Sequence, residues 1–449
     1  MAGSSVDAVS SGIPIAVTSA GARAAYKNPF LWVPSSYLAM GLIYVTVGSV
    51  ANIMFKNMGM PNDQAAFWSS LLGLPYTLKP LWAPLLELYK TKRFFVVLMQ
   101  LVLAVVVTGV AFALRLPGMT FVVPVIALLG IAAFAGATQD IGSDGVYVTT
   151  LASRDQARYT GVQSMCWNLG PILAMGLLVR VSGMLHERTQ DWGAAWMVIM
   201  LIIAGLVLAA GLYHIRMLPP GAKALEAPKS AGDAMKTFGK AFATFFQKKG
   251  ILPMIAFAFF YRFGLGLLDK MGPLFMIDDR AHGGLGLSNQ TLGDINGTFG
   301  TGAFIVGSAL GGLFVARRGL KRSLLILCLC LNVPNVTFLV LSQSMTSNLY
   351  LITAIVTLEK LGWGVGCVGH MIYMMQQIAP GPYKTAHYTF ATAFMGFCMM
   401  TTGMLSGLIQ KAVGYPWFFI IVLIAAAPSL LATIFAPFHQ SDGLEPARA

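Results

Sequence analysis

Long apolar stretches, repeated along nearly the whole chain, limit most strongly what this sequence can fold into. Helices of about 20 apolar residues are long enough to cross a bilayer. Hydrophobic residues make up 56% of the 449-residue chain and charged ones only 10%. Such a composition leaves too little polar surface to cover a globule in water. The sequence therefore predicts an all-α membrane protein of about twelve transmembrane helices.

The apolar runs and the one long polar connection predict the domain organisation. Spans are expected near residues 31–55, 65–86, 94–114, 121–147, 159–181, 192–214, 251–276, 288–315, 323–342, 349–377, 385–411 and 415–436. A polar segment, 218–249, separates the sixth span from the seventh. We expect a disordered tail at 1–30, a six-helix bundle at 31–217, this linker, a second bundle at 250–437 and a tail at 438–449.

The positions of the basic residues predict the orientation. The net charge of +13 would suit a soluble protein that binds nucleic acid, but here the basic residues concentrate between alternate spans. One side has little beyond Lys56, Arg115, Arg188, Arg280 and Lys411. By the positive-inside rule both termini are expected in the cytoplasm, and no nucleic-acid partner is expected.

Three other features bear on location. Residues 1–27 lack the charged start and short apolar core of a signal peptide. The linker lysines are interpreted as a solvated face, with contact to anionic lipid headgroups as the alternative. All five cysteines lie in apolar runs without metal-type spacing, so they are expected to be reduced packing residues.

Two loops at equivalent places in the two bundles predict a gate. They are the segment 85–93 after the second span and the segment 312–322 after the eighth. Both resemble the Gly-x-Leu-Ala-Asp-Arg-x-Gly-Arg-Arg loop of the major facilitator superfamily, although Ala83 stands at the first glycine and Ala316 at the acidic position of the second copy. The expected gating residues are Glu87, Lys90, Arg93, Arg317 and Lys321.

Ionisable residues at span depth are the first functional candidates. A charge in the bilayer centre costs roughly 2.5–3.5 kcal/mol on insertion scales, so it usually faces the protein interior and has a function. Helical spacing places Asp140 with Asp144, Arg262 with Asp269, and Glu359 with His370 on common faces. Carboxylates and histidine can carry protons, and the candidates are Asp140, Asp144, Glu359 and His370.

The remaining polar and aromatic side chains on these spans are candidates for solute binding. Cations such as Arg262, Lys270 and Lys360 suit anionic groups, and aromatic rings can stack on sugars. The full set is Lys79, Gln139, Arg262, Asp269, Lys270, Lys360, Tyr37, Tyr44, Tyr261 and Trp363. Two alternatives stay open: ion pairs that merely tie helices together, such as Lys79 with Asp140 or Arg262 with Glu359, and aromatic rings that only pack or face lipid.

Four segments resemble the AmpG-type muropeptide permease branch of the superfamily. They are 78–85, 137–145 with its Gln-Asp-Ile-Gly-Ser-Asp run, 261–264 and 358–362. The resemblance implies that spans one, four, seven and ten line a central cavity. It also implies proton-driven import of a bulky polar solute, such as an anhydro-muropeptide, across the bacterial inner membrane. The best-known permeases of this branch have two further carboxy-terminal spans.

The expected function is thus secondary active transport by alternating access. The alternatives are a siderophore permease or another small-solute transporter of the same branch and, from another class, a membrane-embedded acyltransferase. An acyltransferase would need a catalytic His or Asp near a cytoplasmic opening, for which the lone His370 gives weak support. The expected partners are a small-molecule substrate, protons and the lipid bilayer. The chain is expected to be a monomer without cofactor or metal, and not an enzyme.

Overall fold

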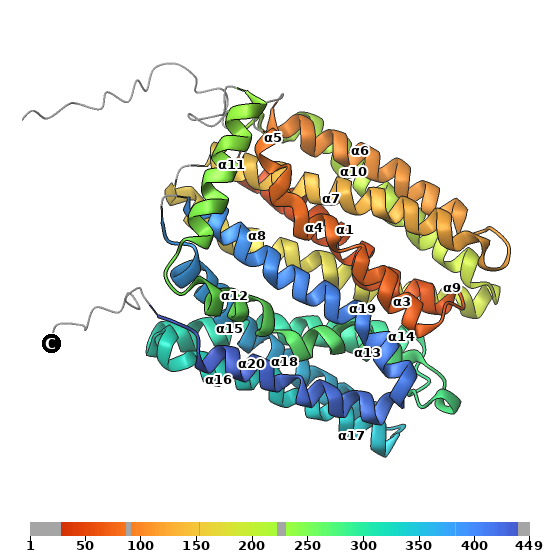
Figure 1. The fold of residues 1–449 in the computed structure, drawn as a ribbon. Coiled ribbons are helices and arrows are strands. Elements are labelled where there is room, and N and C mark those ends of the chain that lie inside the picture. Colours follow the sequence, from red (N-terminus) through yellow and green to blue (C-terminus); the bar gives the residue numbers. More distant parts are fainter. Residues whose placement is uncertain (1–27, 87–90, 152, 222–229, 382, 439–449) are drawn as a thin grey trace, which may run out of the picture.

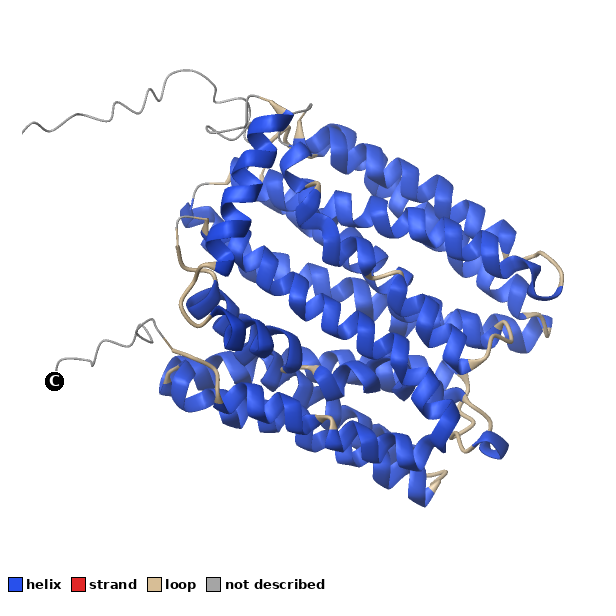
Figure 2. Ribbon diagram, in the orientation of Figure 1, coloured by secondary structure: helices blue, strands red, loops and turns tan. Residues whose placement is uncertain are grey.

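The computed structural model describes residues 28–86, 91–151, 153–221, 230–381 and 383–438. Within these residues the chain consists of helices joined by turns and short loops, and the ribbon contains no strand (Figure 2). A helix satisfies its backbone hydrogen bonds internally, which a segment in hydrocarbon must do because no water is present there. The fold class is therefore as the composition predicts.

Several helices of the first half, before the linker, are interrupted. α1 (Val33–Val45) continues through a π-helical turn, Thr46–Val50, into α2 (Ala51–Asn57). The second expected span is cut into α3 (Asn62–Leu71), α4 (Leu74–Leu78) and α5 (Ala83–Leu86). Prolines 75, 80 and 84 lie along it, and proline removes a backbone donor and disfavours helix at the preceding residue.

The other helices of this half are longer. They are α6 (Lys92–Ala113), α7 (Val122–Thr150), α8 (Ser153–Pro171), a π-helical segment Ile172–Leu178, α9 (Val179–Thr189) and α10 (Trp192–Met217). α6 packs against both α7 and α10, and α1 packs against α8.

The second half follows a similar plan. Its helices are α12 (Ile251–Phe260), α13 (Phe263–Ile277), α14 (Asn289–Leu292), a π-helical segment Gly293–Gly300, α15 (Thr301–Arg318), α16 (Leu320–Asn332), α17 (Val336–Ser344), α18 (Leu349–Tyr373), a π-helical turn Met374–Ile378, α19 (Lys384–Ile424) and α20 (Ala426–Ile434). α18 packs closely on α15 because Gly364 lies against the backbone of Phe304: a Cβ there would be 2.2 Å from its carbonyl oxygen.

Ten stretches among the described residues are long and apolar enough to cross a membrane. Two differences separate this number from the twelve expected spans. The span at 65–86 is broken into short helices, and the spans at 385–411 and 415–436 form one stretch, Lys384–Ile434. Gly414 kinks that stretch at φ 75°, a conformation that favours glycine. The chain turns back at Gly414, at one end of the bundle, and returns through residues 415–424 of α19 and then α20 (Figure 1).

Two seams join the halves. At the first, α3 and α4 pack against α19; at the second, the π-helical segments 172–178 and 293–300 pack on each other. Backbones touch at the second seam, since a Cβ on Gly297 would be 2.3 Å from the nitrogen of Gly176. The two ends of the molecule are the linker face and the opposite face, where α2 ends and α3 begins.

The linker contains α11 (Ala231–Phe246), which contacts α5 of the first half and α19 of the second (Figure 1). Lys248, just beyond it, donates to the carbonyl oxygens of Ile378 and Pro380 at the end of the tenth expected span. Burial lowers the pKa of Lys248 to about 8. The linker is thus anchored to the second half and touches the first.

Candidate functional site between the two halves

The carboxylates of the first half each contact a group from another helix. Asp140 and Asp144 are four residues apart on α7, so they share one face. The amine of Lys79, at the proline break of the second span, lies 3.6 Å from Asp140. The hydroxyl of Tyr37 on α1 donates to Asp144 at 2.8 Å. Three helices therefore meet around two acidic groups.

Gln139 precedes Asp140 on α7 and is fully buried. Its amide oxygen and nitrogen both lack a hydrogen-bond partner among the described residues. A buried amide without partners is costly, at about 1–3 kcal/mol for each unsatisfied group. Gln139 therefore remains a candidate for solute binding, because both atoms can still form hydrogen bonds.

The second half holds its acidic group differently. Glu359 on α18 is 1% exposed, and its nearest cation is its sequence neighbour Lys360, whose amine is 3.3 Å away. The same amine lies 4.5 Å from the centre of the Trp363 ring. Stacking on an aromatic face stabilises a cation. Glu359, Lys360 and Trp363 therefore form one local cluster on α18.

Arg262 lies where the seventh expected span is interrupted. α12 ends at Phe260 and α13 starts at Phe263, and Arg262 between them has a non-helical backbone. Among the described residues no ion pair is recorded for it, and its Nε has no hydrogen-bond partner. A half-buried guanidinium without an acid is an available anion-binding group.

Tyr44 is a residue of the first half that lies near this arginine. It is 46% exposed although it lies late in α1, and its ring packs edge-on against Tyr76 at 5.0 Å. It is within electrostatic range of Arg262 and Asp269, which lie on the other half. Tyr44 therefore faces the space between the halves.

Lys270 on α13 lies at the boundary between the halves. It is 8% exposed, and its backbone carbonyl accepts a hydrogen bond from Asn52 of α2 at 2.9 Å. Gly48, in the π-helical turn after α1, is close to its amine. Asp269 and Lys270 thus approach the first half from α13, the helix that begins just after Arg262.

Two candidates are enclosed within the second half. His370 is fully buried between α12 and α18, where its Nε2 is 3.1 Å from the carbonyl oxygen of Ala258. Tyr261 is also fully buried and donates to the carbonyl oxygen of Gly366 at 3.0 Å. In this conformation neither side chain reaches the space between the halves, unlike Tyr44.

The expected gating loops are only partly visible. Glu87 and Lys90 lie outside the described residues. Arg93 binds the start of the linker through the carbonyl oxygens of Leu218 and Pro220. Arg317 is exposed, and the amine of Lys321 lies 5.9 Å from the ring centre of Phe438.

The sequence reasoning missed a polar cluster at the opposite face, centred on Asp278. This buried carboxylate accepts hydrogen bonds from Lys56 at 2.7 Å, Asn62 at 2.8 Å and Tyr415 at 3.0 Å. Burial alone would raise the pKa of Asp278, but these hydrogen bonds outweigh it and hold the pKa below its ordinary value. Lys56 and Asn62 belong to the first half, so the cluster joins the halves.

Further polar contacts between the halves gather near this face. Lys411 pairs with Asp63 at 2.9 Å, and Asn289 donates to Asn57 at 2.7 Å. Arg180 pairs with Asp294 across the second seam. The signal available in sequence was weak, because each of these residues lies near the end of a span, where polar residues are common.

The chain matches known transporters along most of its length. The sequence profile of the Major Facilitator Superfamily matches residues 34–401. An anhydromuropeptide permease of Escherichia coli strain K12 is 24% identical over 389 residues, which are 85% of this chain and 73% of the relative. A putative transporter AmpG 4 of Rickettsia conorii is 21% identical over 411 residues, covering 89% of this chain and 94% of that one.

Solved structures show the same fold. A D-xylose-proton symporter superposes with a TM-score of 0.68 at 12% identity, covering 90% of this chain and 95% of the other. The nucleoside transporter NupG superposes with a TM-score of 0.64 at 16% identity, covering 90% of this chain and 97% of the other. The helical fold, the apolar spans and the matched profile establish that this multi-pass membrane protein belongs to the major facilitator superfamily of transporters.

Proposed function

We propose that the protein is a proton-coupled importer of a bulky polar solute, with anhydro-muropeptides as the favoured class. The observation that carries the proposal is the arrangement of charge between the halves: acidic groups of α7 on one side, and Arg262 beside α13 on the other. Similarity to a permease named for anhydromuropeptides supports the solute class. Such solutes carry sugars and carboxylates, which suit aromatic rings and an unpaired guanidinium.

In the proposed cycle the two six-helix bundles, 31–217 and 250–437, alternate in access around this central site. The contacts around Asp278 favour a state closed at the opposite face. The solute and a proton enter from the opposite face and leave at the linker face. This direction is import, because the linker and both termini are cytoplasmic. The protein acts as a monomer in the bacterial inner membrane.

Asp140 is the proposed proton site, because among the proton candidates Asp140, Asp144 and Glu359 it is the one that forms an ion pair with a cation from another helix. Protonation would release Lys79 from the ion pair and free it to move or to bind the solute. Asp144, held by a neutral tyrosine, and Glu359, beside Lys360, are the next candidates. This mechanism couples the charge on α7 to the position of the broken second span.

The first experiment measures uptake of labelled anhydro-muropeptide by cells that lack their own permease and express this chain. Accumulation that a protonophore abolishes is expected. The matched control is Asp233→Asn, which changes an exposed carboxylate on α11. Absence of uptake by a well-inserted protein would contradict the solute class, and uptake indifferent to the protonophore would contradict proton coupling.

A further inference from the structure

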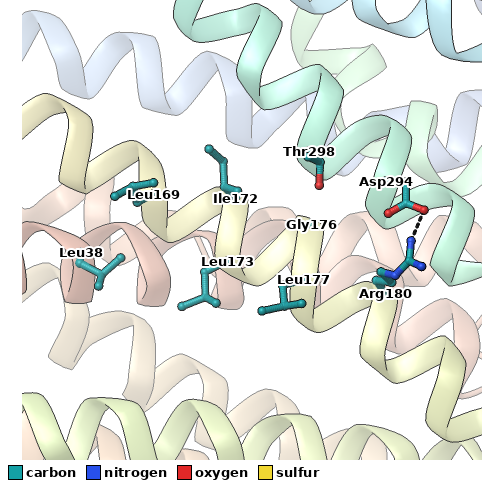
Figure 3. Close-up of a pocket in the computed structure, with 9 residues that line it drawn as sticks. All are labelled: Leu38, Leu169, Ile172, Leu173, Gly176, Leu177, Arg180, Asp294 and Thr298. Atoms are coloured by element: carbon teal, nitrogen blue, oxygen red, sulfur yellow. Dashed lines mark hydrogen bonds and ion pairs between the residues drawn. The ribbon is translucent and has the colours of Figure 1, made fainter.

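An apolar groove of about 370 Å³ lies on the second seam, and its lining includes none of the charged residues of the central site (Figure 3). Its walls are mainly the leucines 169, 173 and 177 of the fifth expected span and Leu38 of α1. Arg180 and Asp294 stand together at one end of it, joined by their ion pair. The groove thus combines a long apolar wall with one charged end.

Two leucines of this groove are exposed at span depth. Leu169 and Leu177 are 42% and 52% exposed, and both lie within the candidate span Gly161–Thr189. Exposed surface at span depth meets either lipid or the space between the halves, and the apolar wall of leucines at this groove favours lipid. A volume of this size is near the lower end of pockets that hold organic ligands, which is roughly 300–1,000 Å³.

The ion pair lies close to the headgroup level of the bilayer. Arg180 is about 13 Å along the helix from Thr189, at about 1.5 Å per residue. The span has 29 residues and is therefore about 43 Å long, whereas the hydrocarbon layer is about 30 Å thick. With equal overhang at each end, Arg180 starts about 7 Å inside the hydrocarbon and can extend its guanidinium towards the headgroups.

Both charges of the pair keep exposed surface. The side chain of Arg180 is 44% exposed and that of Asp294 is 42% exposed. Charges that face a bilayer are costly unless polar partners solvate them. A headgroup with one phosphate and one ammonium matches this pair, because the phosphate suits the guanidinium and the ammonium suits the carboxylate. An anionic headgroup without an ammonium would meet the carboxylate unfavourably.

We propose that this groove binds one zwitterionic glycerophospholipid, with an acyl chain along the leucines, its phosphate at Arg180 and its ammonium at Asp294. Each buried methylene contributes about 0.8 kcal/mol. Arg180 belongs to the first half and Asp294 to the second, so the bound headgroup bridges the seam where Gly176 and Gly297 touch. The site is separate from solute binding and does not depend on which solute is carried.

The test is native mass spectrometry of the full-length protein, purified in detergent and incubated with phosphatidylethanolamine or with phosphatidylglycerol of the same acyl chains. We expect one phosphatidylethanolamine to be retained, at least tenfold in preference to phosphatidylglycerol. Leu177→Trp fills the groove and is expected to lower retention at least tenfold. The matched control is Leu325→Trp on α16, a leucine that is 43% exposed and distant from the seam, and it should retain the lipid.

A second variant separates headgroup recognition from groove shape. Asp294→Asn keeps the size of the side chain but removes the charge that the ammonium contacts. We expect the preference for phosphatidylethanolamine over phosphatidylglycerol to fall towards one while the groove still accepts an acyl chain. Equal retention of both lipids by the unaltered protein, or equal retention by Leu177→Trp and Leu325→Trp, would overturn the proposal.

Discussion

The two halves of the molecule hold the charges of the central site in different ways. In the first half, Asp140 and Asp144 contact Lys79 and Tyr37, which come from other helices. In the second half, Glu359 lies beside its own sequence neighbour, and Arg262 has no recorded ion pair among the described residues. A charge whose partner comes from another helix couples protonation to helix position, whereas an unpaired cation is available to a ligand. This difference supports our proposal that the first half couples protons and the second half binds an anionic group of the solute.

The largest expected effect comes from removing the titratable group of the first half. Asp140→Asn can still accept a hydrogen bond from Lys79 but cannot carry a proton. We expect proton-driven accumulation to be abolished while exchange of labelled for unlabelled solute continues. Uptake and counterflow in vesicles measure the two activities. Loss of both accumulation and exchange would show that Asp140 binds the solute or stabilises the fold. Normal accumulation would show that Asp140 is not the proton site.

A slightly smaller effect, on the balance between the access states, is expected from a substitution at Asp278, where the halves meet. Asp278→Ala leaves Lys56 without its acid, which costs about 2 kcal/mol for a partly exposed pair and shifts the balance of access states about 30-fold. A cysteine at position 44, facing the space between the halves, should then react faster with an impermeant thiol reagent from the opposite face.

The matched control for this variant is Asp279→Asn, which alters the exposed neighbouring carboxylate. The native cysteines are buried or half-buried, so background labelling should be low. If both substitutions change the labelling rate equally, the cluster around Asp278 does not hold the opposite face closed.

Replacing the unpaired cation of the second half tests its assignment to the solute. Arg262→Gln removes a charge-assisted contact, which contributes about 1.5–3 kcal/mol when it is made. We expect KM to rise about tenfold with a smaller change in the maximal rate, because binding and not proton transfer is lost. An unchanged KM with a lower maximal rate would indicate that Arg262 acts in the conformational change and not in solute binding.

The pH dependence of the opposite face should be weak. The pKa of Asp278 is lowered in the folded protein, so its contacts are fully present above the ordinary aspartate pKa of about 3.9 and are lost only as pH falls through the lower value. Between about pH 5 and about pH 8 the labelling rate at position 44 should therefore follow only the thiolate fraction of the cysteine, with no added change from opening of this face. A change within that range that disappears in Asp278→Asn would contradict this expectation.

The smallest effect is expected at Tyr261. Tyr261→Phe removes one hydrogen bond to a buried carbonyl group, which should lower stability by about 1 kcal/mol and leave KM unchanged. Thermal unfolding in detergent and uptake kinetics measure the two quantities. A raised KM would return Tyr261 to the solute site, where sequence reasoning first placed it.

Much of the fold could be predicted from the sequence, because each span must be apolar over its own length. Details within spans were less predictable. Prolines 75, 80 and 84 signalled the broken second span, but nothing in the local sequence indicated the π-helical segments at 172–178 and 293–300. Those segments form the seam between the halves, and their geometry follows from the packing of Gly176 against Gly297.

The candidate site was predicted in part. Depth along a span placed Lys79, Asp140 and Arg262 in the membrane, and one pairing considered from sequence, Lys79 with Asp140, is present. The sequence did not predict how each helix is rotated about its own axis. His370 lies on a face of α18 that is turned away from the space between the halves, and its burial depends on how α12 and α18 pack.

The sequence by itself determined the membrane class, the approximate positions of most spans and the set of residues at span depth, and it predicted the two-part organisation. Hydropathy is a local property that sums over about 20 residues, so these features need no knowledge of distant contacts. Only the tertiary structure decided which charges pair, which stay available and how the halves meet at Asp278 and at the Arg180 groove. The contacts at Asp278 and at the Arg180 groove join residues more than a hundred positions apart, and all of these pairings depend on helix rotation, tilt and close packing.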